Sequence, residues 1–191
     1  MSKSILNDIQ IASLVIANDF IEPYEESQIR KVDNNKVISY GQSSYGYDVR
    51  LSDVFAIPVK QDKVVDPKDS SSISSAFEEV RVGTFIDLPP QGFILGHTVE
   101  YFRVPENIFG VCIGKSTYAR LGLDILVSPL EPGFNGHVVI EITNNTPNTV
   151  RIYANEGICQ FIFFEGEPPT LTYDDRPNNY QNQQGVKLAQ I

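Results

Sequence analysis

Short runs of β-forming residues, separated at close intervals by turn residues, are the feature that most restricts the fold of this chain. The clearest run is FILGHTVEYFRV, residues 93–104, in which polar and apolar side chains alternate. Further runs read RVGTFIDL, NIFGVCI, GHVVIEIT, TVRIYA and GICQFIFF, with Gly, Pro and Asn between them. Many short strands with regular turns are typical of a barrel or a sandwich, so we predict a mainly β fold.

The first residues predict a short helix. Residues 4–18 hold apolar side chains at helical spacing, and Ser4 precedes them as a candidate N-cap. We expect the helix to bury one face, made of Ile5, Ile9, Ala12 and Ile16. The serine-rich segment KDSSSISS, residues 68–75, is instead expected to form a flexible loop.

The length of the chain fits one domain. With 191 residues it is too short for two ordinary domains and long enough to bury a core. We therefore assign residues 1–191 to a single domain. Its last part, from about residue 168 to residue 191, is polar and rich in Asn and Gln. This segment is either disordered or partly docked through Tyr173 and Tyr180.

Charge and composition exclude several classes of function. The formal net charge is −9, whereas a general nucleic-acid binder needs a basic face. No apolar run is long enough to span a bilayer. Asp8 interrupts any signal-peptide core, so we expect a cytoplasmic protein that binds neither nucleic-acid polymers nor membranes. Cys112 and Cys159 lie in apolar strand-like runs and are expected to be reduced thiols.

Glu141 is a candidate for chemistry because of its position in a strand. In HVVIEIT, residues 137–143, Val138, Ile140 and Ile142 form the apolar set, so Glu141 projects from the opposite face. On this pattern alone, such a glutamate is usually a solvated surface residue. The turn EPGFNG directly before the strand and the polar segment GKSTYAR upstream favour a functional role.

The segment GKSTYAR, residues 114–120, invites comparison with a P-loop but does not match one. Three residues separate Gly110 from Gly114, where the P-loop needs four. A lysine, two hydroxyls and an arginine after a strand are nevertheless suited to phosphate, which backbone N–H groups, Lys115 and Arg120 would bind. The pattern fits a phosphate-binding loop and a capped surface turn equally well.

The sequence contains no recognisable zinc site. Zinc-dependent nucleoside deaminases carry H-x-E and P-C-x-x-C motifs, and neither occurs here. His97 and His137 are isolated in the sequence, and His97 is expected to be a packed, hydrogen-bonded residue of an apolar strand. Two histidines leave a Ser-His-Asp triad open, but nothing resembles a nucleophile elbow.

Four segments together resemble dCTP deaminase. They are SYGQSSYGYDVRLSDVF (residues 39–55), TVEYFRVPENIFGVCIGKSTYARLGL (98–123), SPLEPGFNGHVVIEITN (128–144) and IYANEGICQFIFFE (152–165). The blocks follow the family's order and spacing over nearly the whole chain, whereas GKSTYAR alone is only suggestive because dUTPases carry a related motif. The resemblance implies the dUTPase-like fold, a distorted β-barrel or jelly roll. It also implies a homotrimer with active sites between subunits.

The resemblance implies a reaction as well: hydrolytic deamination of dCTP to dUTP and ammonia, which supplies dUTP for thymidylate synthesis. Glu141 would take a proton from water and deliver it to N3 of cytosine, while the hydroxide attacks C4. Ser116 would hold the water together with a backbone carbonyl of the Ser128-Pro129 stretch. Arg120 would position Glu141.

The substrate contacts implied by the resemblance come from three parts of the chain. They are the loop Lys115, Ser116, Thr117, Tyr118, Ala119 and Arg120, the strand residues Val139, Ile140 and Glu141, and Gln160, Tyr173 and Gln183. Mg²⁺ would be carried by the triphosphate, so neither a protein metal ligand nor zinc is expected. Asn179 replaces a lysine usual in the family, and Arg176 and Lys187 are candidates to compensate.

Three alternatives remain open at this point. A bifunctional enzyme that also cleaves dUTP to dUMP typically carries S-T-A-G-[FW]-I-D-x-G-F, whereas this chain reads VSPLEPGF over residues 127–134, with Glu131 in place of the aspartate. A plain dUTPase would carry a glycine-rich C-terminal arm, which the sequence lacks. A non-catalytic nucleotide-binding trimer is disfavoured by the presence of Glu141, Ser116 and Arg120 together.

Overall fold

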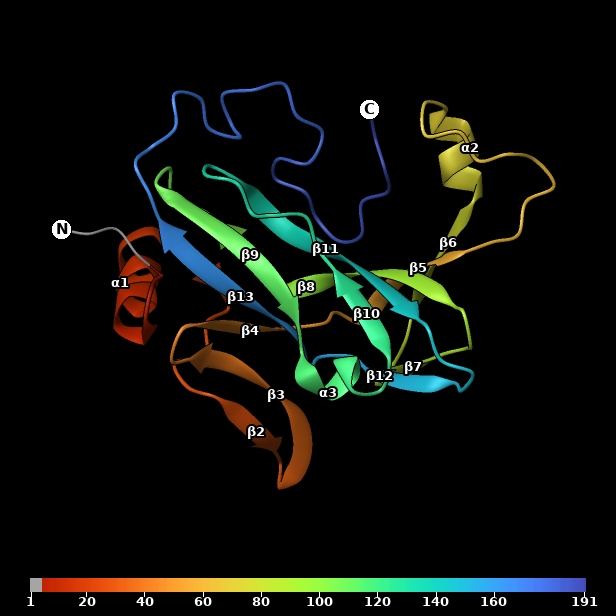
Figure 1. Ribbon diagram of the computed structural model, residues 1–191, viewed down its shortest axis with the longest axis horizontal. Helices are drawn as coiled ribbons and strands as arrows, with labels where there is room; N and C mark the ends of the chain where they lie inside the picture. Colours follow the sequence, from red (N-terminus) through yellow and green to blue (C-terminus); the bar gives the residue numbers. More distant parts are fainter. Residues whose placement is uncertain (1–4) are drawn as a thin grey trace.

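The computed structural model describes residues 5–191, and strands form most of its regular structure (Figure 1). The helices of this part are α1 (Asp8–Asn18), α2 (Ser70–Ser75) and α3 (Ser116–Ala119). The strands are β1 (Ile21–Glu22), β2 (Ile29–Val32), β3 (Asn35–Ser43), β4 (Gly46–Arg50), β5 (Val54–Pro58), β6 (Phe77–Arg81), β7 (Phe85–Leu88), β8 (Phe93–Arg103), β9 (Ile108–Gly114), β10 (Leu123–Leu126), β11 (Asn135–Asn144), β12 (Val150–Tyr153) and β13 (Gly157–Glu165).

Two antiparallel sheets organise these strands. The larger has the order β10-β11-β8-β5-β6, with β1 paired to β8, and the other has the order β2-β3-β4-β13-β9. β12 and β7 form a separate pair. The predicted runs at 93–104, 107–113, 136–143 and 157–164 correspond to β8, β9, β11 and β13. The mainly β prediction is confirmed, and the open sheet order describes a distorted jelly roll rather than a closed barrel.

An aromatic cluster fills the space between the two sheets. Phe102 of β8 and Phe161 and Phe163 of β13 are fully buried, together with Phe20. The ring centroids of Phe102 and Phe161 lie 5.2 Å apart, and those of Phe20 and Phe163 lie 4.8 Å apart. Because burial of one such side chain contributes about 1.5–3 kcal/mol, this cluster fixes how the sheets pack.

Helix α1 differs from the prediction in its start and in its buried face. It begins at Asp8, because Asn7 and Gln10 cap it reciprocally, and Ser4 lies outside the described residues. Ile11 is fully buried, whereas Ile9 is 72% exposed and Ile16 is 87% exposed. Two sets of apolar residues in this helix have helical spacing. The rest of the fold packs against the set that contains Ile11 and not against the predicted set. No helix within residues 5–191 is long and apolar enough to cross a membrane.

The serine-rich segment is more regular than predicted. Residues 70–75 form helix α2 rather than a loop, because the side chain of Asp69 accepts a hydrogen bond of 2.9 Å from the N–H of Ser71. Buried Ile73 attaches the helix to the body of the molecule. The local cap and one apolar contact are sufficient to order a segment whose composition indicated flexibility.

The C-terminal segment contains no helix or strand, yet it is docked. The Tyr173 ring packs edge-on against Phe134 with the centroids 5.6 Å apart. Gln183 forms a parallel bridge with Gly136, at the start of β11. Of the two alternatives for this segment, docking through Tyr173 is therefore confirmed.

Candidate active site

Glu141 lies on β11, between β10 and β8 of the larger sheet, with its side chain on the face opposite the core. Alternate residues of β11 are buried, and Glu141 belongs to the half-exposed set, as predicted. It pairs with Leu126 of β10 on one side and with Leu95 of β8 on the other. Burial raises the pKa of Glu141 above its ordinary value. A hydrogen bond from the residue's own backbone N–H to its carboxylate opposes this shift. A half-buried carboxyl with a raised pKa is suited to take up and release a proton.

The backbone next to Glu141 forms an open strand edge. β10 ends at Leu126, opposite Glu141, and the tail residue Gln183 pairs with Gly136 on the same side of β11. Among the described residues, no strand pairs with residues 138–140 on that edge. The sequence contributes to the gap, because Pro129 follows soon after the end of β10 and proline has no N–H to continue a ladder.

The direction of the backbone groups at this edge follows from their neighbours. The N–H of Val138 donates to the hydroxyl of Thr98 in β8, whereas the N–H of His137 donates to the carbonyl of Gln183. Successive residues of a strand point their backbone groups to opposite sides. The N–H and C=O of Val139 therefore point to the open edge, side by side with Glu141.

The segment GKSTYAR forms the connection between the two sheets. β9 ends at Gly114, α3 follows, and β10 begins at Leu123. Tyr118 is buried and its hydroxyl accepts a hydrogen bond of 3.0 Å from the N–H of Tyr153. Ser116, Thr117, Ala119 and Arg120 remain exposed, so the loop is anchored by Tyr118 and presents its hydroxyls and guanidinium outward.

Lys115 is mostly buried, unlike the exposed residues that follow it. Its ammonium lies 2.7 Å from Asp48 of β4, and the side chain of Gln28 donates to the same carboxylate oxygen at 2.8 Å. Sequence analysis did not identify Asp48. The available signal was a single aspartate in the strand-like run YGYDVRL, because a carboxylate at a buried strand position needs a partner.

The predicted site residues fall into two groups within one chain. Val139 and Glu141 lie on β11, where Ile140 is buried and offers only its backbone, and Tyr173 and Gln183 of the docked tail lie beside Phe134 and Gly136, near the start of that strand. The loop residues 115–120 lie beyond the far end of β10, and Gln160 lies on β13, where it donates to Ser43 at 2.7 Å. In the described part of the chain, no hydrogen bond or ion pair joins Ser116 or Arg120 to Glu141.

The two histidines, isolated in the sequence, lie together beside the first group. The ring centroids of His97 and His137 lie 5.3 Å apart, since β8 and β11 are neighbouring strands. Nδ1 of each ring contacts the carbonyl oxygen of Thr98, at 2.9 and 3.0 Å. His97 is buried, which lowers its pKa, and the prediction of a packed, hydrogen-bonded residue is confirmed.

The cysteines lie on the other sheet. Cys112 of β9 and Cys159 of β13 are both free thiols, in agreement with the sequence analysis. Cys159 is fully buried, and burial raises its pKa, whereas Cys112 is only partly buried. Neither thiol lies on the strands that carry Glu141 or the histidines.

Comparison with known proteins gives one consistent family. A family model described as dCTP deaminase-like matches residues 5–166. The dCTP deaminase of Acidiphilium cryptum is 48% identical over 189 residues, which cover 98% of this chain and 99% of the relative. The dCTP deaminase of Rickettsia bellii (strain OSU 85-389) is 46% identical over 187 residues, which cover 97% of this chain and 98% of the relative.

A solved structure supports the fold independently. The 2′-deoxycytidine 5′-triphosphate deaminase from Agrobacterium tumefaciens superposes on 87% of this chain with a TM-score of 0.63 at 18% identity. This chain spans 48% of that protein's length. At this identity the likeness concerns the fold alone, and it agrees with the architecture predicted from the sequence.

Proposed function

The chain belongs to the dCTP deaminase-like family, and from this premise we propose that it is a cytoplasmic enzyme that hydrolyses dCTP to dUTP and ammonia. One observation supports the proposal above the others. Glu141, a half-buried carboxyl with a raised pKa, stands next to a strand edge whose backbone groups have no strand partner within residues 5–191. The site thus places a carboxyl that can carry a proton beside backbone groups that can bind a ligand.

The open edge suits a pyrimidine base. The N–H and C=O of Val139 offer one donor and one acceptor side by side, and cytosine presents acceptors next to its amino donor. We propose that these groups hold the base in the plane of the sheet.

Glu141 then acts as base and as acid. It accepts a proton from water, and the resulting hydroxide bonds to C4. The same carboxyl delivers the proton to N3, which gives a tetrahedral intermediate. Breaking the C4–N4 bond, with transfer of a proton to the amino nitrogen, releases ammonia and leaves the uracil carbonyl. Dual use of one group favours a pKa near the working pH, and burial moves the pKa of Glu141 in that direction.

We further propose that a second copy of the chain completes each site in a homotrimer. Ser116 and Arg120, assigned to the catalytic water and to positioning of Glu141, are exposed, and in the described part of the chain neither is bonded to Glu141. β9 and β13 also expose large apolar side chains, with Phe109 at 39%, Ile113 at 53% and Phe164 at 36%. Exposed apolar patches of this kind favour association.

The proposed role of Mg²⁺ is to accompany the triphosphate. Within residues 5–191, no group of three or more His, Cys, Asp or Glu side chains is arranged to hold a metal ion. The proposal therefore gives the protein no resident metal and gives Glu141, rather than zinc, the activation of water. Mg²⁺ prefers phosphate oxygens and water as ligands, and its role is to screen the phosphate charge.

The test is incubation of the protein with dCTP and Mg²⁺, with separation of the nucleotides and enzymatic assay of ammonia. We expect dUTP and ammonia to form in equal amounts. Unchanged dCTP under conditions where the protein is folded and binds the nucleotide would instead support the non-catalytic alternative.

A further inference from the structure

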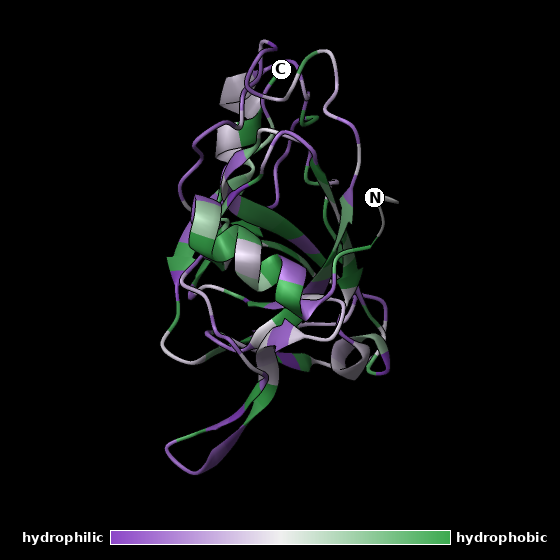
Figure 2. Ribbon diagram, turned by 90° about the vertical axis from the view of Figure 1, so that its left-hand side faces the viewer, coloured by the Kyte–Doolittle hydropathy of each residue, from purple (hydrophilic) through white to green (hydrophobic). Residues whose placement is uncertain are grey.

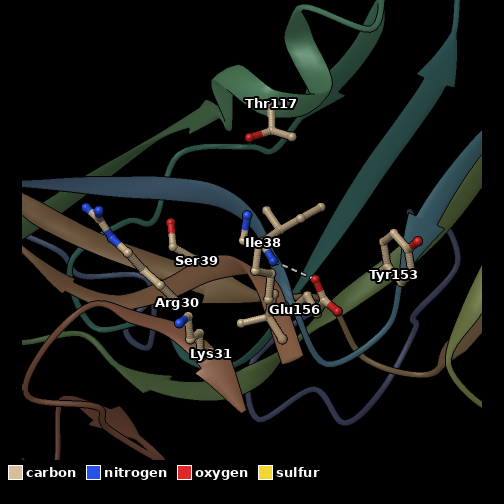
Figure 3. Close-up of a pocket in the computed structure, with 9 residues that line it drawn as sticks. Arg30, Lys31, Ile38, Ser39, Thr117, Tyr153 and Glu156 are labelled. Carbon is tan, nitrogen blue, oxygen red and sulfur yellow. Dashed lines mark hydrogen bonds between the residues drawn. The ribbon is translucent and has the colours of Figure 1, made fainter. Parts of the chain in front are cut away.

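A cavity of about 710 Å³ lies between α3 and the β2–β3 hairpin, which projects from the body of the molecule (Figure 2). Figure 3 shows Thr117 of α3 on one side of it and Glu156, which accepts a hydrogen bond of 2.6 Å from the N–H of Ile38, on the other. Glu141 is not among the residues that line this cavity. The position of the proposed catalytic carboxyl instead follows from the pairing of β11 with its neighbouring strands.

A β-bulge interrupts the pairing of β8 with β11 close to this carboxyl. His137 pairs with Tyr101 before the interruption. Val139 pairs with His97 after it. Residues 98–100 of β8 therefore stand opposite one residue of β11. Bulges occur often beside active sites, where they change the direction or the register of a strand.

Thr98 occupies the bulge and is fully buried. Its hydroxyl accepts a hydrogen bond of 2.9 Å from the N–H of Val138 and donates one of 2.6 Å to the carbonyl of Glu100. The N–H of Val138 thus has a side-chain acceptor where a regular ladder would supply a backbone carbonyl. Because a buried N–H without a partner is costly, the hydroxyl stabilises the irregular pairing.

The carbonyl oxygen of Thr98 makes two further contacts. Nδ1 of His97 lies 2.9 Å from it, and Nδ1 of His137 lies 3.0 Å from it. Because a carbonyl oxygen can only accept, both nitrogens are the donors. One histidine belongs to β8 and the other to β11. Thr98 therefore links the two strands through its carbonyl as well as through its hydroxyl.

The bulge decides which residue of β8 stands directly beside Glu141. In the structure this residue is Leu95. A regular ladder continued from the pair of His137 and Tyr101 would instead place His97 there. The two registers differ by two residues, so they keep the same side chains on the same faces of the sheet. Alternation along the sequence therefore favours neither register.

The choice of register matters for the charge on Glu141. Leu95 is nearly buried and carries no charge. The titratable side chains on the same face are Asp124 of β10 and His97 of β8, both diagonal to Glu141, and His137 farther along β11. Among the described residues, none of the three is a cause of the raised pKa of Glu141, which comes from burial. A histidine directly opposite would be charged below its ordinary pKa of 6.5, and a cation beside a carboxylate lowers the carboxyl pKa.

We propose that Thr98 positions Glu141, because its hydroxyl and carbonyl hold the bulge that pairs Glu141 with Leu95 rather than with His97. The inference rests on the proposed function, since Glu141 is the proposed catalytic carboxyl. Thr98 acts through the register of the strands and not by contact with the nucleotide. Its hydroxyl therefore affects the pH at which Glu141 becomes protonated, which a residue that only fills the core would not do.

The first experiment compares the pH profile of kcat/KM for dCTP in Thr98→Val with that of the wild type. Valine keeps the shape of threonine but leaves the N–H of Val138 without its acceptor, and closing the bulge toward a regular ladder would restore one. We expect kcat to fall about tenfold or more, since small displacements of catalytic groups are costly. The acid inflection should move to lower pH, because His97 approaches Glu141. Thr98→Ser keeps the hydroxyl and should retain the wild-type profile.

The matched control is Thr146→Val, in the turn after β11. The hydroxyl of Thr146 is also bonded, to the side chain of Asn144 and the carbonyl of Asn148, but it lies outside the bulge. We expect this variant to keep the inflection of the wild type. Adding His97→Gln to Thr98→Val should return the inflection to the wild-type pH, because the cation is gone, while kcat stays low.

The second experiment needs no turnover. Carbon-13 NMR of protein labelled at glutamate measures the pKa of the Glu141 carboxyl, and Glu141→Gln assigns its signal. We expect a lower carboxyl pKa in Thr98→Val than in the wild type. Equal pKa values and equal inflections in the two folded proteins would overturn the inference even if dCTP is deaminated. A lowered pKa in Thr98→Val, with a wild type that does not deaminate dCTP, would refute the proposed function while supporting the role of Thr98.

Circular dichroism shows whether each variant is folded. If Thr98→Val does not fold, His137→Phe takes its place in the NMR measurement, because it removes one donor to the Thr98 carbonyl and keeps the hydroxyl in the bulge. The carboxyl pKa of Glu141 should again fall, although loss of a nearby histidine would by itself raise it. An unchanged or raised pKa in folded His137→Phe would contradict the inference.

Discussion

The ammonium nitrogen of Lys115 lies 2.7 Å from a carboxylate oxygen of Asp48, with both side chains about nine-tenths buried. Lys115 stands at the start of α3 and Asp48 stands in β4. The bond therefore ties the loop that carries Ser116 and Arg120 to the five-stranded sheet. The resemblance gave Lys115 a role in binding the nucleotide, and the structure gives it a structural partner.

Removing the Lys115 charge should destabilise the protein. In Lys115→Met, Asp48 keeps only its hydrogen bond from Gln28, and breaking a buried pair from one side typically costs about 3–5 kcal/mol. Urea unfolding of the variant measures this cost. Adding Asp48→Asn should recover part of the loss, because the uncompensated carboxylate is gone.

The control for Lys115 is Arg81→Met, which breaks the more exposed pair between Arg81 and Asp53. Exposed pairs contribute at most about 1 kcal/mol. If Lys115→Met is no more costly than this control, the Lys115–Asp48 pair has no structural role.

Replacing Glu141 should remove catalysis without removing the fold. Glu141→Gln keeps the size of the side chain on a half-exposed strand face but cannot carry the proton. We expect turnover of dCTP to fall by about 10²–10⁴-fold, the usual contribution of general acid–base catalysis. Steady-state kinetics and dCTP binding are measured together, with Glu78→Gln on the exposed part of β6 as the matched change. Near-normal turnover in Glu141→Gln would refute the proposed mechanism.

The pH dependence of activity should reveal the raised pKa of Glu141. Burial raises this pKa above 4.5, so the carboxyl becomes protonated at a higher pH than an ordinary glutamate does. The protonated form cannot accept a proton from water, and kcat/KM should fall on the acid side with an inflection above 4.5. Measurements of kcat/KM across the acid range determine the pH of this inflection.

The same shift predicts an effect on stability with a defined sign. When the pKa of a carboxyl is higher in the folded than in the unfolded state, the group contributes most to stability at pH values below its unfolded-state pKa. This contribution is lost as the pH rises through the folded-state pKa. At neutral pH, Glu141→Gln should therefore be slightly more stable than the wild type, and the difference should vanish below the ordinary pKa. An equal difference at both pH values would place the carboxyl in an unperturbed environment.

Local patterns predicted β7, β8, β9, β11, β12 and β13, left β1–β6 and β10 unpredicted, and predicted the buried face of α1 wrongly. Alternation with a period of two is decided within one strand, and β11 places Glu141 opposite the core set of Val138 and Ile140 as expected. In α1, by contrast, two apolar sets have equally good helical spacing. Which set becomes buried depends on the rest of the fold, and Ile11 rather than Ile9 or Ile16 faces the core.

Local patterns identified segments of the candidate site but not how those segments are arranged relative to one another. GKSTYAR and the strand around Glu141 are each visible as local patterns. The partner of Lys115 is 67 positions away, and it meets Lys115 only because β4 and β9 both pair with β13. Spacing along the chain contains no information of that kind.

Removing metal ions should distinguish zinc-dependent deamination from deamination by water that Glu141 activates. Because the proposal assigns water activation to Glu141, a zinc-selective chelator should leave dCTP deamination intact. Removing Mg²⁺ should weaken activity through KM, since Mg²⁺ screens the triphosphate. Metal analysis of the purified protein accompanies both assays. Stoichiometric zinc whose removal abolishes turnover would contradict the assignment to Glu141.

The last prediction concerns whether the product keeps its triphosphate. Release of pyrophosphate needs a second water held in line with the α-phosphate by another carboxylate, and Glu131 is the residue at the corresponding place in VSPLEPGF. Its side chain is one methylene longer than the aspartate of the bifunctional enzymes, and a displacement of about 1 Å can cost 10²-fold in rate. Its carboxylate is also engaged by Arg176 of the docked tail.

We therefore expect dUTP to accumulate with one ammonia per dCTP and without pyrophosphate, in the wild type and in Glu131→Gln alike. Separation of dUTP and dUMP over the time course, with a coupled pyrophosphate assay, measures this. Arg176→Ala frees the Glu131 carboxylate and tests whether the ion pair alone prevents the second reaction. Because Ser128-Pro129 also lacks the T-A-G backbone, freeing the carboxylate should not be enough, and we expect this variant to release no pyrophosphate either. Pyrophosphate formed by the wild type at the rate of ammonia release, and lost in Glu131→Gln, would establish the bifunctional reaction instead.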